Sequence, residues 1–313
     1  MGVKRSRKTA SSWGVTFQEH CPGAIRDVMI FFMPTFSAFD GTELAYHEKG
    51  EGAPLICLPG GPMRASAYLG DLGGLTAYRK LILLDLRGTG DSAVPGDPET
   101  YRCDRIVDDV EALREHLGLD RIDLLAHSAG GNVATLYAAR HPKRIRALAL
   151  ITAASQAVGL TVTIKDHLEA VAAHRGEPWY PAAVAVLKEI EAGGSPANAG
   201  EALAPLAYGR WDATARAHQA ASASEKNADA AAAFYADGAF DPPATRAALA
   251  ELTAPVLVLA GEYDGGPNPA HAEELAALFP GGVRQVQPRA GHFPWLDDPE
   301  WFVRRVAGFL AQD

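Results

Sequence analysis

Short runs of consecutive, mostly apolar residues recur along the chain and predict the strands of a sheet. Apolar runs of this kind are typical of strands that are buried on both faces, as in parallel sheets. The runs occupy residues 55–58, 81–84, 122–125, 147–151 and 256–259. Two shorter runs, 36–38 and 44–46, flank an Asp-Gly pair that suits a tight antiparallel turn. We therefore expect a hairpin followed by a mostly parallel sheet.

Amphipathic helices are predicted between these strands. After the second long run, apolar residues recur at helical spacing at Ile106, Val110, Leu113 and Leu117, and Gly118 marks the helix end. A second helix is predicted after residue 128 and ends before Pro142. Strands that alternate with helices imply an α/β fold, a parallel sheet with helices on both faces.

The alternation stops between residues 156 and 251, a segment rich in alanine and punctuated by proline and glycine. We interpret it as a helical lid inserted into an α/β core that comprises residues 33–155 and 252–313. Five aromatic residues of the lid could line a substrate pocket, although packing within the lid explains each of them more simply. They are Trp179, Tyr180, Trp211, Phe234 and Tyr235.

Composition and charge narrow the range of functions. The 313 residues carry a formal net charge of -9, which argues against nucleic acid as a partner because phosphate binding needs a basic face. Every apolar run is shorter than the roughly 20 residues of a membrane-spanning helix, so we expect no membrane partner. Cys21, Cys57 and Cys103 show neither disulfide nor metal-ligand spacing, which favours a reducing compartment, the cytoplasm. The oligomeric state stays open.

The first 32 residues differ from the rest, with five Lys or Arg against two Asp or Glu. A secretory signal needs an uninterrupted apolar stretch of about 7–15 residues and a small-residue cleavage site, and neither is convincing here. We predict that residues 1–32 form a basic extension outside the core, with Met33 as the functional start.

The most informative position is Ser128, where an apolar run ends in small residues and a helical pattern begins at once. A serine on a sharp strand-to-helix turn has a strained backbone, and only small side chains fit two positions before and after it. Ala126 and Gly130 meet that demand. The pattern predicts a nucleophile elbow. From these residues alone, the alternative is a serine that only caps a helix.

Four further segments fall into a fixed order along the chain. Residues 59–62 read Pro-Gly-Gly-Pro, and residues 85–92 read Asp-Leu-Arg-Gly-Thr-Gly-Asp-Ser. Asp264 follows the last long apolar run, and His292 lies near the C-terminus. The resulting order is nucleophile, acid, histidine. Over residues 33–313 the chain thus resembles the α/β-hydrolase family, and its glycine loop resembles that of the prolyl aminopeptidase branch.

The resemblance implies a role for each of these residues. Ser128 would be the nucleophile, His292 its general base, and Asp264 the acid that orients the histidine. The backbone N–H groups of Gly61 and Ala129 would form the oxyanion hole. The fold implied is that of an α/β-hydrolase, with an inserted helical lid.

Other polar residues near these motifs receive structural interpretations. His127 should face away from the catalytic base, and Asp297 and Asp298 should begin the last helix. Residues 88–90 lack the third glycine of a dinucleotide-binding loop, so we interpret them as a tight turn. Because His, Asp and Glu show no metal-ligand spacing in the sequence, we expect neither a cofactor nor a metal.

These features favour a cofactor-independent serine hydrolase that cleaves a carboxylic ester or amide through an acyl-enzyme. Its substrate would be a small ester, a lactone or a short peptide. Two departures weaken the aminopeptidase alternative: Pro59 replaces the histidine usual in that branch, and residues 126–130 differ from its Gly-Gly-Ser-Trp-Gly elbow.

An aminopeptidase also needs lid carboxylates that bind the substrate ammonium. Surface solvation explains the available candidates better, and these are Glu177, Glu225, Asp229 and Asp237. A third alternative is a non-catalytic protein that uses the same fold to bind a ligand.

Overall fold

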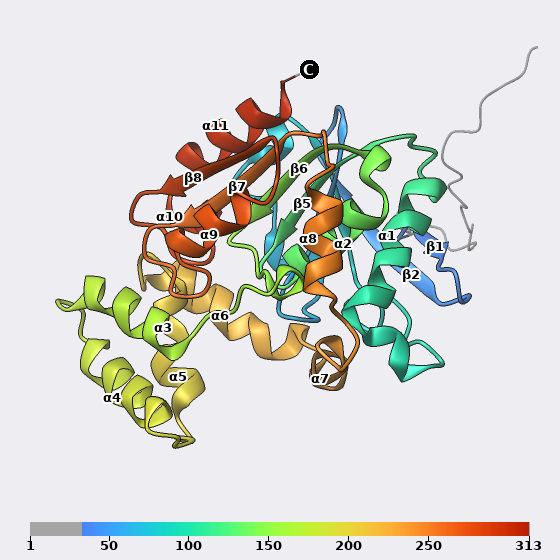
Figure 1. The fold of residues 1–313 in the computed structure, drawn as a ribbon. Helices are drawn as coiled ribbons and strands as arrows, with labels where there is room; N and C mark the ends of the chain where they lie inside the picture. The colour runs from blue at the N-terminus through green and yellow to red at the C-terminus, as the bar shows by residue number, and fades with distance from the viewer. Residues whose placement is uncertain (1–32, 313) are drawn as a thin grey trace, which may run out of the picture.

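The computed structural model describes residues 33–312, in which eight strands form one sheet (Figure 1). The spatial order is β1-β2-β4-β3-β5-β6-β7-β8. Strands β1 and β2 form an antiparallel hairpin, β2 also pairs antiparallel with β4, and all later neighbours are parallel. The strands are β1 (Thr35–Ser37), β2 (Glu43–Lys49), β3 (Pro54–Leu58), β4 (Lys80–Leu84), β5 (Ile122–His127), β6 (Ile145–Ile151), β7 (Val256–Gly261) and β8 (Gly282–Gln287).

Seven of these strands coincide with the predicted apolar runs, and the mostly parallel sheet is confirmed. The sequence analysis missed β8, an edge strand whose residues are mainly half-buried or exposed. An edge strand has one unpaired side and needs no continuous apolar run, so this segment resembled a loop. The predicted basic extension, residues 1–32, lies outside the described residues.

Helices cover both faces of the sheet because successive side chains of each strand point to opposite sides. One face packs against α1 (Cys103–His116), α2 (Gly130–Arg140) and α9 (Pro269–Ala276). The other face packs against α11 (Pro299–Leu310) and the short 3₁₀ helix η1 (Ser66–Leu69). In β3, for example, Ile56 belongs to the first apolar cluster and Cys57 to the second.

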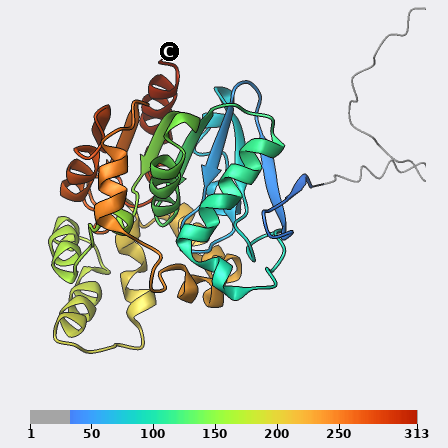
Figure 2. The same ribbon diagram turned by 45° about the vertical axis from the view of Figure 1, so that its right-hand side comes forward.

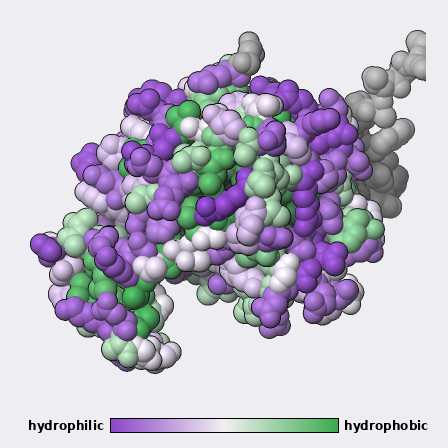
Figure 3. All heavy atoms as spheres, in the orientation of Figure 1, coloured by the Kyte–Doolittle hydropathy of each residue, from purple (hydrophilic) through white to green (hydrophobic). Residues whose placement is uncertain are grey.

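Six helices lie between β6 and β7, and they fall into two groups. The first three share a small apolar cluster of their own, which contains Val171, Ala183, Leu187 and Leu206. We call this group the α3–α5 projection, because it extends away from the core in both ribbon views (Figures 1 and 2). The group consists of α3 (Ile164–Val171), α4 (Tyr180–Glu191) and α5 (Ala199–Leu203). Apolar residues also show on its surface (Figure 3).

The other three helices contribute directly to the apolar clusters of the sheet. These helices are α6 (Ala213–Glu225), α7 (Ala228–Phe234) and α8 (Pro242–Leu249). Ala215 joins the cluster on one face, while Phe234 and Leu249 join the cluster on the other. The helical character predicted for residues 156–251 therefore agrees with the structure, whereas a single lid with those limits stays a prediction.

Packing accounts for four of the five aromatic residues in this segment. Trp179 and Tyr180 lie against the cluster of the α3–α5 projection, Trp211 lies against a sheet cluster, and Phe234 is buried. Tyr235 is 40% exposed. Within residues 33–312, none of the helices is long and apolar enough to cross a membrane. Location in the cytoplasm stays a prediction.

Candidate active site

Ser128 lies on the sharp turn between β5 and α2 and has a left-handed backbone, with φ = 52°. That conformation is strained for a residue with a side chain. The turn is tied to the neighbouring strand, because the Ser128 N–H donates to the carbonyl oxygen of Ile151 at 3.1 Å. A Cβ atom at Gly130 would lie 2.5 Å from the carbonyl oxygen of Pro59, so the position needs glycine. The predicted elbow geometry is confirmed.

The structure brings the three predicted triad residues together, although they follow three different strands. His292 Nε2 lies 2.8 Å from Ser128 Oγ, and His292 Nδ1 lies 2.7 Å from Asp264 Oδ2. A carboxylate can only accept, so Nδ1 carries the proton and Nε2 is left to accept the hydroxyl proton of the serine. Asp264 is 3% exposed, and its other oxygen accepts from the N–H of Gly266 at 2.9 Å.

The backbone of His292 is held by three hydrogen bonds from three parts of the chain. Its N–H donates to the carbonyl oxygen of Ala207 at 2.8 Å. Its carbonyl oxygen accepts from Thr152 Oγ1 at 2.9 Å and from His127 Nε2 at 2.8 Å. The prediction that His127 faces away from the base is therefore wrong. The two imidazole rings lie only 4.9 Å apart, because the loop after β8 folds back over the end of β5.

The glycine loop after β3 lies directly against the elbow. The Gly60 N–H donates to Tyr68 Oη at 2.6 Å, and a Cβ at Gly60 would lie 2.6 Å from the Cβ of Ser128. Within the described residues, the backbone N–H groups of Gly61 and Ala129 have no acceptor. Two such donors beside a serine could bind a developing oxyanion, so the proposal that Gly61 and Ala129 form the hole has geometric support.

A seam of hydrogen bonds joins this loop to the helical segment above it. Arg64 Nε donates to Glu225 Oε2 at 2.7 Å, and their side chains are only 6% and 20% exposed. Backbone bonds on either side reinforce the pair, because Ala65 N–H donates to the Glu225 carbonyl and Asn227 N–H to the Met63 carbonyl. We call residues 63–65 with 225–227 the loop–helix seam.

The seam corrects one prediction about the lid carboxylates. Glu177, Asp229 and Asp237 are exposed, as expected for solvated side chains. Glu225 instead is half-buried and paired with Arg64. The sequence carried no signal of this, because the two residues are 161 positions apart.

Asp297 also differs from its prediction, whereas Asp298 agrees with it. Asp298 caps α11 by accepting from the N–H of Trp301 at 3.0 Å. Asp297 ends the preceding short helix, α10 (Pro294–Asp297), and accepts from the N–H groups of Gly209 and Gly291 at 3.0 and 2.8 Å. Burial raises the pKa of Asp297 despite these bonds. Its carboxylate thus ties the helical segment to the loop that carries His292.

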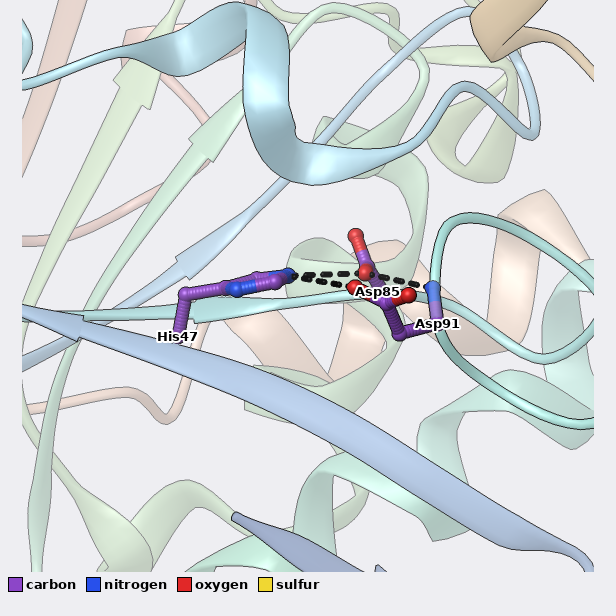
Figure 4. A group of neighbouring side chains, drawn as sticks. All are labelled: His47, Asp85 and Asp91. Atoms are coloured by element: carbon purple, nitrogen blue, oxygen red, sulfur yellow. Dashed lines mark hydrogen bonds and ion pairs between the residues drawn. The ribbon is translucent and has the colours of Figure 1, made fainter. Parts of the chain in front are cut away.

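The Asp85 segment forms the predicted tight turn around one carboxylate (Figure 4). Asp85 Oδ1 accepts from the N–H of Ser66 at 2.7 Å, and Oδ2 accepts from the N–H of Asp91 at 3.0 Å. His47 Nε2 lies 2.9 Å from the same Oδ2. His47, Asp85 and Asp91 lie close enough together to hold a cation. The hydrogen bonds already explain the buried carboxylate, which anchors the turn against η1.

Comparisons with known proteins agree with this fold. A family described as "alpha/beta hydrolase fold" matches residues 53–173. The solved esterase of Thermogutta terrifontis, in its malate-bound form, superposes with a TM-score of 0.65 over 90% of this chain and 98% of that one, at 24% identity. The chain has the α/β-hydrolase fold. The resemblance inferred from the four motifs is confirmed.

Curated relatives of the chain include proline iminopeptidases. The enzyme of Heyndrickxia coagulans is 25% identical over 276 residues, which cover 85% of this chain and 93% of the relative. The enzyme of Lactobacillus helveticus (strain DPC 4571) is 39% identical over 126 residues, and the match spans only 43% of its length.

Proposed function

We propose that this hydrolase cleaves a carboxylic ester through an acyl-enzyme formed on Ser128. The observation that carries the proposal is the continuous arrangement Ser128–His292–Asp264, with bonds of 2.8 and 2.7 Å. A serine hydroxyl is a poor nucleophile at neutral pH and needs a base within hydrogen-bond reach. Asp264 holds the imidazole in the tautomer that can take the proton.

The proposed reaction has two halves. Ser128 Oγ attacks the ester carbonyl while its proton moves to His292 Nε2, and the carbonyl oxygen becomes an oxyanion bound by the N–H groups of Gly61 and Ala129. The intermediate collapses, the bond to the leaving alkoxide breaks, and His292 protonates that oxygen. Water then attacks the acyl-enzyme and gives a proton to His292. The bond between the acyl carbon and Ser128 Oγ breaks, His292 returns the proton to Oγ, and the acid is released.

The charges around the glycine loop favour an ester or lactone over a peptide with a free amino terminus. An ammonium group needs a carboxylate that is not already neutralised, and Glu225 is paired with Arg64. The other carboxylates considered for this role, Glu177, Asp229 and Asp237, are exposed. A neutral, partly apolar substrate makes no demand for such a charge.

Proline-type aminopeptidase activity is the second candidate, favoured by one observation. A curated relative that matches 85% of this chain is a proline iminopeptidase. Amide cleavage would use the same triad and oxyanion donors, with His292 protonating the leaving amine. The two candidates differ only in the acyl group and in the group that binds its amino terminus.

One kinetic comparison separates the candidates. Initial rates on short-chain naphthyl esters and on proline naphthylamide are measured with the wild-type enzyme and with Ser128→Ala as the blank. Ester turnover that depends on Ser128, without amide turnover, supports the proposal. Faster cleavage of the prolyl amide supports the aminopeptidase. Failure of a fluorophosphonate to label Ser128 would indicate a protein that binds a ligand without turnover.

A further inference from the structure

Four residues form one chain of hydrogen bonds behind the triad. The Gly60 N–H lies 2.6 Å from Tyr68 Oη, Tyr68 Oη lies 2.7 Å from His127 Nδ1, and His127 Nε2 lies 2.8 Å from the carbonyl oxygen of His292. The chain thus runs from the glycine loop after β3, through η1 and the last residue of β5, to the residue after β8 that activates the serine. It joins segments more than 200 positions apart in the sequence.

The direction of every bond in this chain is fixed by its two ends. A backbone carbonyl can only accept, so His127 Nε2 must donate to His292. A neutral imidazole then has an acceptor at Nδ1, which must receive the hydroxyl proton of Tyr68. The tyrosine oxygen is left to accept the N–H of Gly60. Each ring nitrogen of His127 thus makes one hydrogen bond, and Tyr68 Oη donates one and accepts one.

Both side chains are buried, and their environment keeps them neutral. Tyr68 is 6% and His127 is 2% exposed. Burial, with a smaller contribution from the neighbouring His292, lowers the pKa of His127, and burial raises the pKa of Tyr68. Aromatic rings enclose the imidazole, since Phe293 and Trp295 have centroids 5.2 and 4.9 Å from it. Both shifts favour the neutral side chains that this bonding pattern requires.

We propose that Tyr68 and His127 are positioning residues that hold the glycine loop and the backbone of His292 at a fixed spacing across Ser128. This inference rests on the proposed function, because it gives His292 and the N–H of Gly61 their catalytic roles. The base and one oxyanion donor come from opposite ends of the chain. A misplacement of about 1 Å in such a constellation can cost about 100-fold in rate.

The competing explanation is that Tyr68 and His127 merely fill the core. A second tyrosine–histidine pair in the same protein provides a control away from the site, with His116 exposed where His127 is buried. Tyr46 is also 6% exposed, and its Oη lies 3.3 Å from His116 Nε2. The ring geometry is alike too, with centroids 5.8 Å apart at Tyr46–His116 and 5.5 Å apart at Tyr68–His127. The Tyr46 pair joins β2 to α1 and touches none of the triad residues.

The test compares Tyr68→Phe with Tyr46→Phe. Each variant loses one tyrosine hydroxyl that is hydrogen-bonded to a histidine, and the two melting temperatures record the cost of each loss to folding. We expect kcat of Tyr68→Phe to fall roughly 10- to 100-fold with KM changed by less than about 3-fold. The rate at which a fluorophosphonate labels Ser128 should fall in parallel. Tyr46→Phe should keep the wild-type kcat.

Two variants of His127 test the other end of the chain. His127→Gln places an amide N–H near the position of Nε2 and can still donate to the His292 carbonyl, whereas His127→Phe cannot. We expect the Gln variant to retain at least ~5-fold more kcat than the Phe variant, with rates expressed per folded protein. Equal losses in the two would overturn the role of this bond.

The outcome that overturns the whole proposal is a Tyr68→Phe enzyme with the same kcat as Tyr46→Phe. This result differs from a failure of the proposed function, in which wild-type Ser128 would not be labelled at all. If Ser128→Ala abolishes turnover while Tyr68→Phe changes nothing, the triad stands and the positioning role falls.

Discussion

The two halves of the helical segment between β6 and β7 are attached to the core in different ways. Helices α6–α8 bury side chains in the two apolar clusters of the sheet and are bonded to the glycine loop through the loop–helix seam. The α3–α5 projection has a separate small cluster. Helices α6–α8 are thus packed together with the candidate active site, whereas the α3–α5 projection is attached to it as a separate unit.

This difference suggests a division of labour. In the proposed mechanism, bond cleavage depends on residues whose positions are fixed by the sheet and by α6–α8. Access and substrate preference are expected to depend on the α3–α5 projection, because a small separate cluster opens at a lower free energy than the main core. The limits of a moving lid would then be narrower than the predicted 156–251, and we propose that they lie near residues 160 and 206.

The largest expected effect is on kcat, and it tests whether bond cleavage depends only on residues of the α/β core. Ser128→Ala and His292→Ala should each lose about 10⁴-fold in kcat, and the double variant should lose little more, because the residues act as a unit. The measurement is kcat on the best naphthyl ester for all three variants. If the fold losses of kcat in the two single variants multiply in the double variant, the two residues act independently and the triad assignment is wrong.

A cavity in the α3–α5 projection should lower the local stability of these three helices alone. Leu187→Ala removes a fully buried side chain from the separate cluster and should cost about 2–5 kcal/mol in local stability. Amide exchange should accelerate in α3–α5 and stay slow in the sheet. The matched control is Leu148→Ala in β6, also fully buried, which should lower the stability of the whole protein. Equal acceleration everywhere in both variants would mean that the projection is no separate unit.

The loop–helix seam should show an energetic coupling between its two charges. Arg64→Gln or Glu225→Gln leaves one charge half-buried and unpaired, whereas the double variant leaves none. Urea unfolding of the three variants should therefore give a coupling free energy of about 1–3 kcal/mol. Strictly additive changes would show that α6 is held by its apolar contacts alone.

The smallest expected effect is a dependence of stability on pH that arises in α6. Burial, helped by the positive charge of Arg64, lowers the pKa of His218 to about 4. Between pH 6.5 and 4 the unfolded chain takes up a proton that the folded protein excludes, so stability should fall as the pH falls through that window. Solvent screening limits the loss to about 1–2 kcal/mol.

Melting temperatures across that window isolate the contribution of His218. The His218→Phe variant should show a shallower decline than the wild-type protein, since other buried histidines with lowered pKa values remain in both. His127, His167 and His174 are such residues. Identical slopes of melting temperature against pH in the two proteins would show that His218 does not contribute to the decline.

The sequence predicted the parts of the structure that depend on local pattern. Strands β3–β7 are buried on both faces and therefore read as apolar runs, and the elbow at Ser128 needs small neighbours in fixed positions. The order of Ser128, Asp264 and His292 was visible because the resemblance places each after a strand. Their distances were not, since these depend on how far each loop bends back over the sheet.

The wrong predictions for His127 and Glu225 have one physical cause, which is contact between segments that are distant in the sequence. His127 meets the backbone of His292, 165 positions away, and Glu225 meets Arg64, 161 positions away. One signal could have warned of the first. A histidine at the end of a long apolar run is buried and must find partners for both ring nitrogens. The run itself cannot say which partners they are.

The bond between the His292 N–H and the carbonyl of Ala207 lies just beyond the end of the α3–α5 projection. Ala207 therefore marks the junction at which the satellite cluster gives way to the rigid frame. We therefore expect that changes within residues 160–206, which carry their own apolar cluster and end beside this anchor, alter selectivity without displacing Ser128.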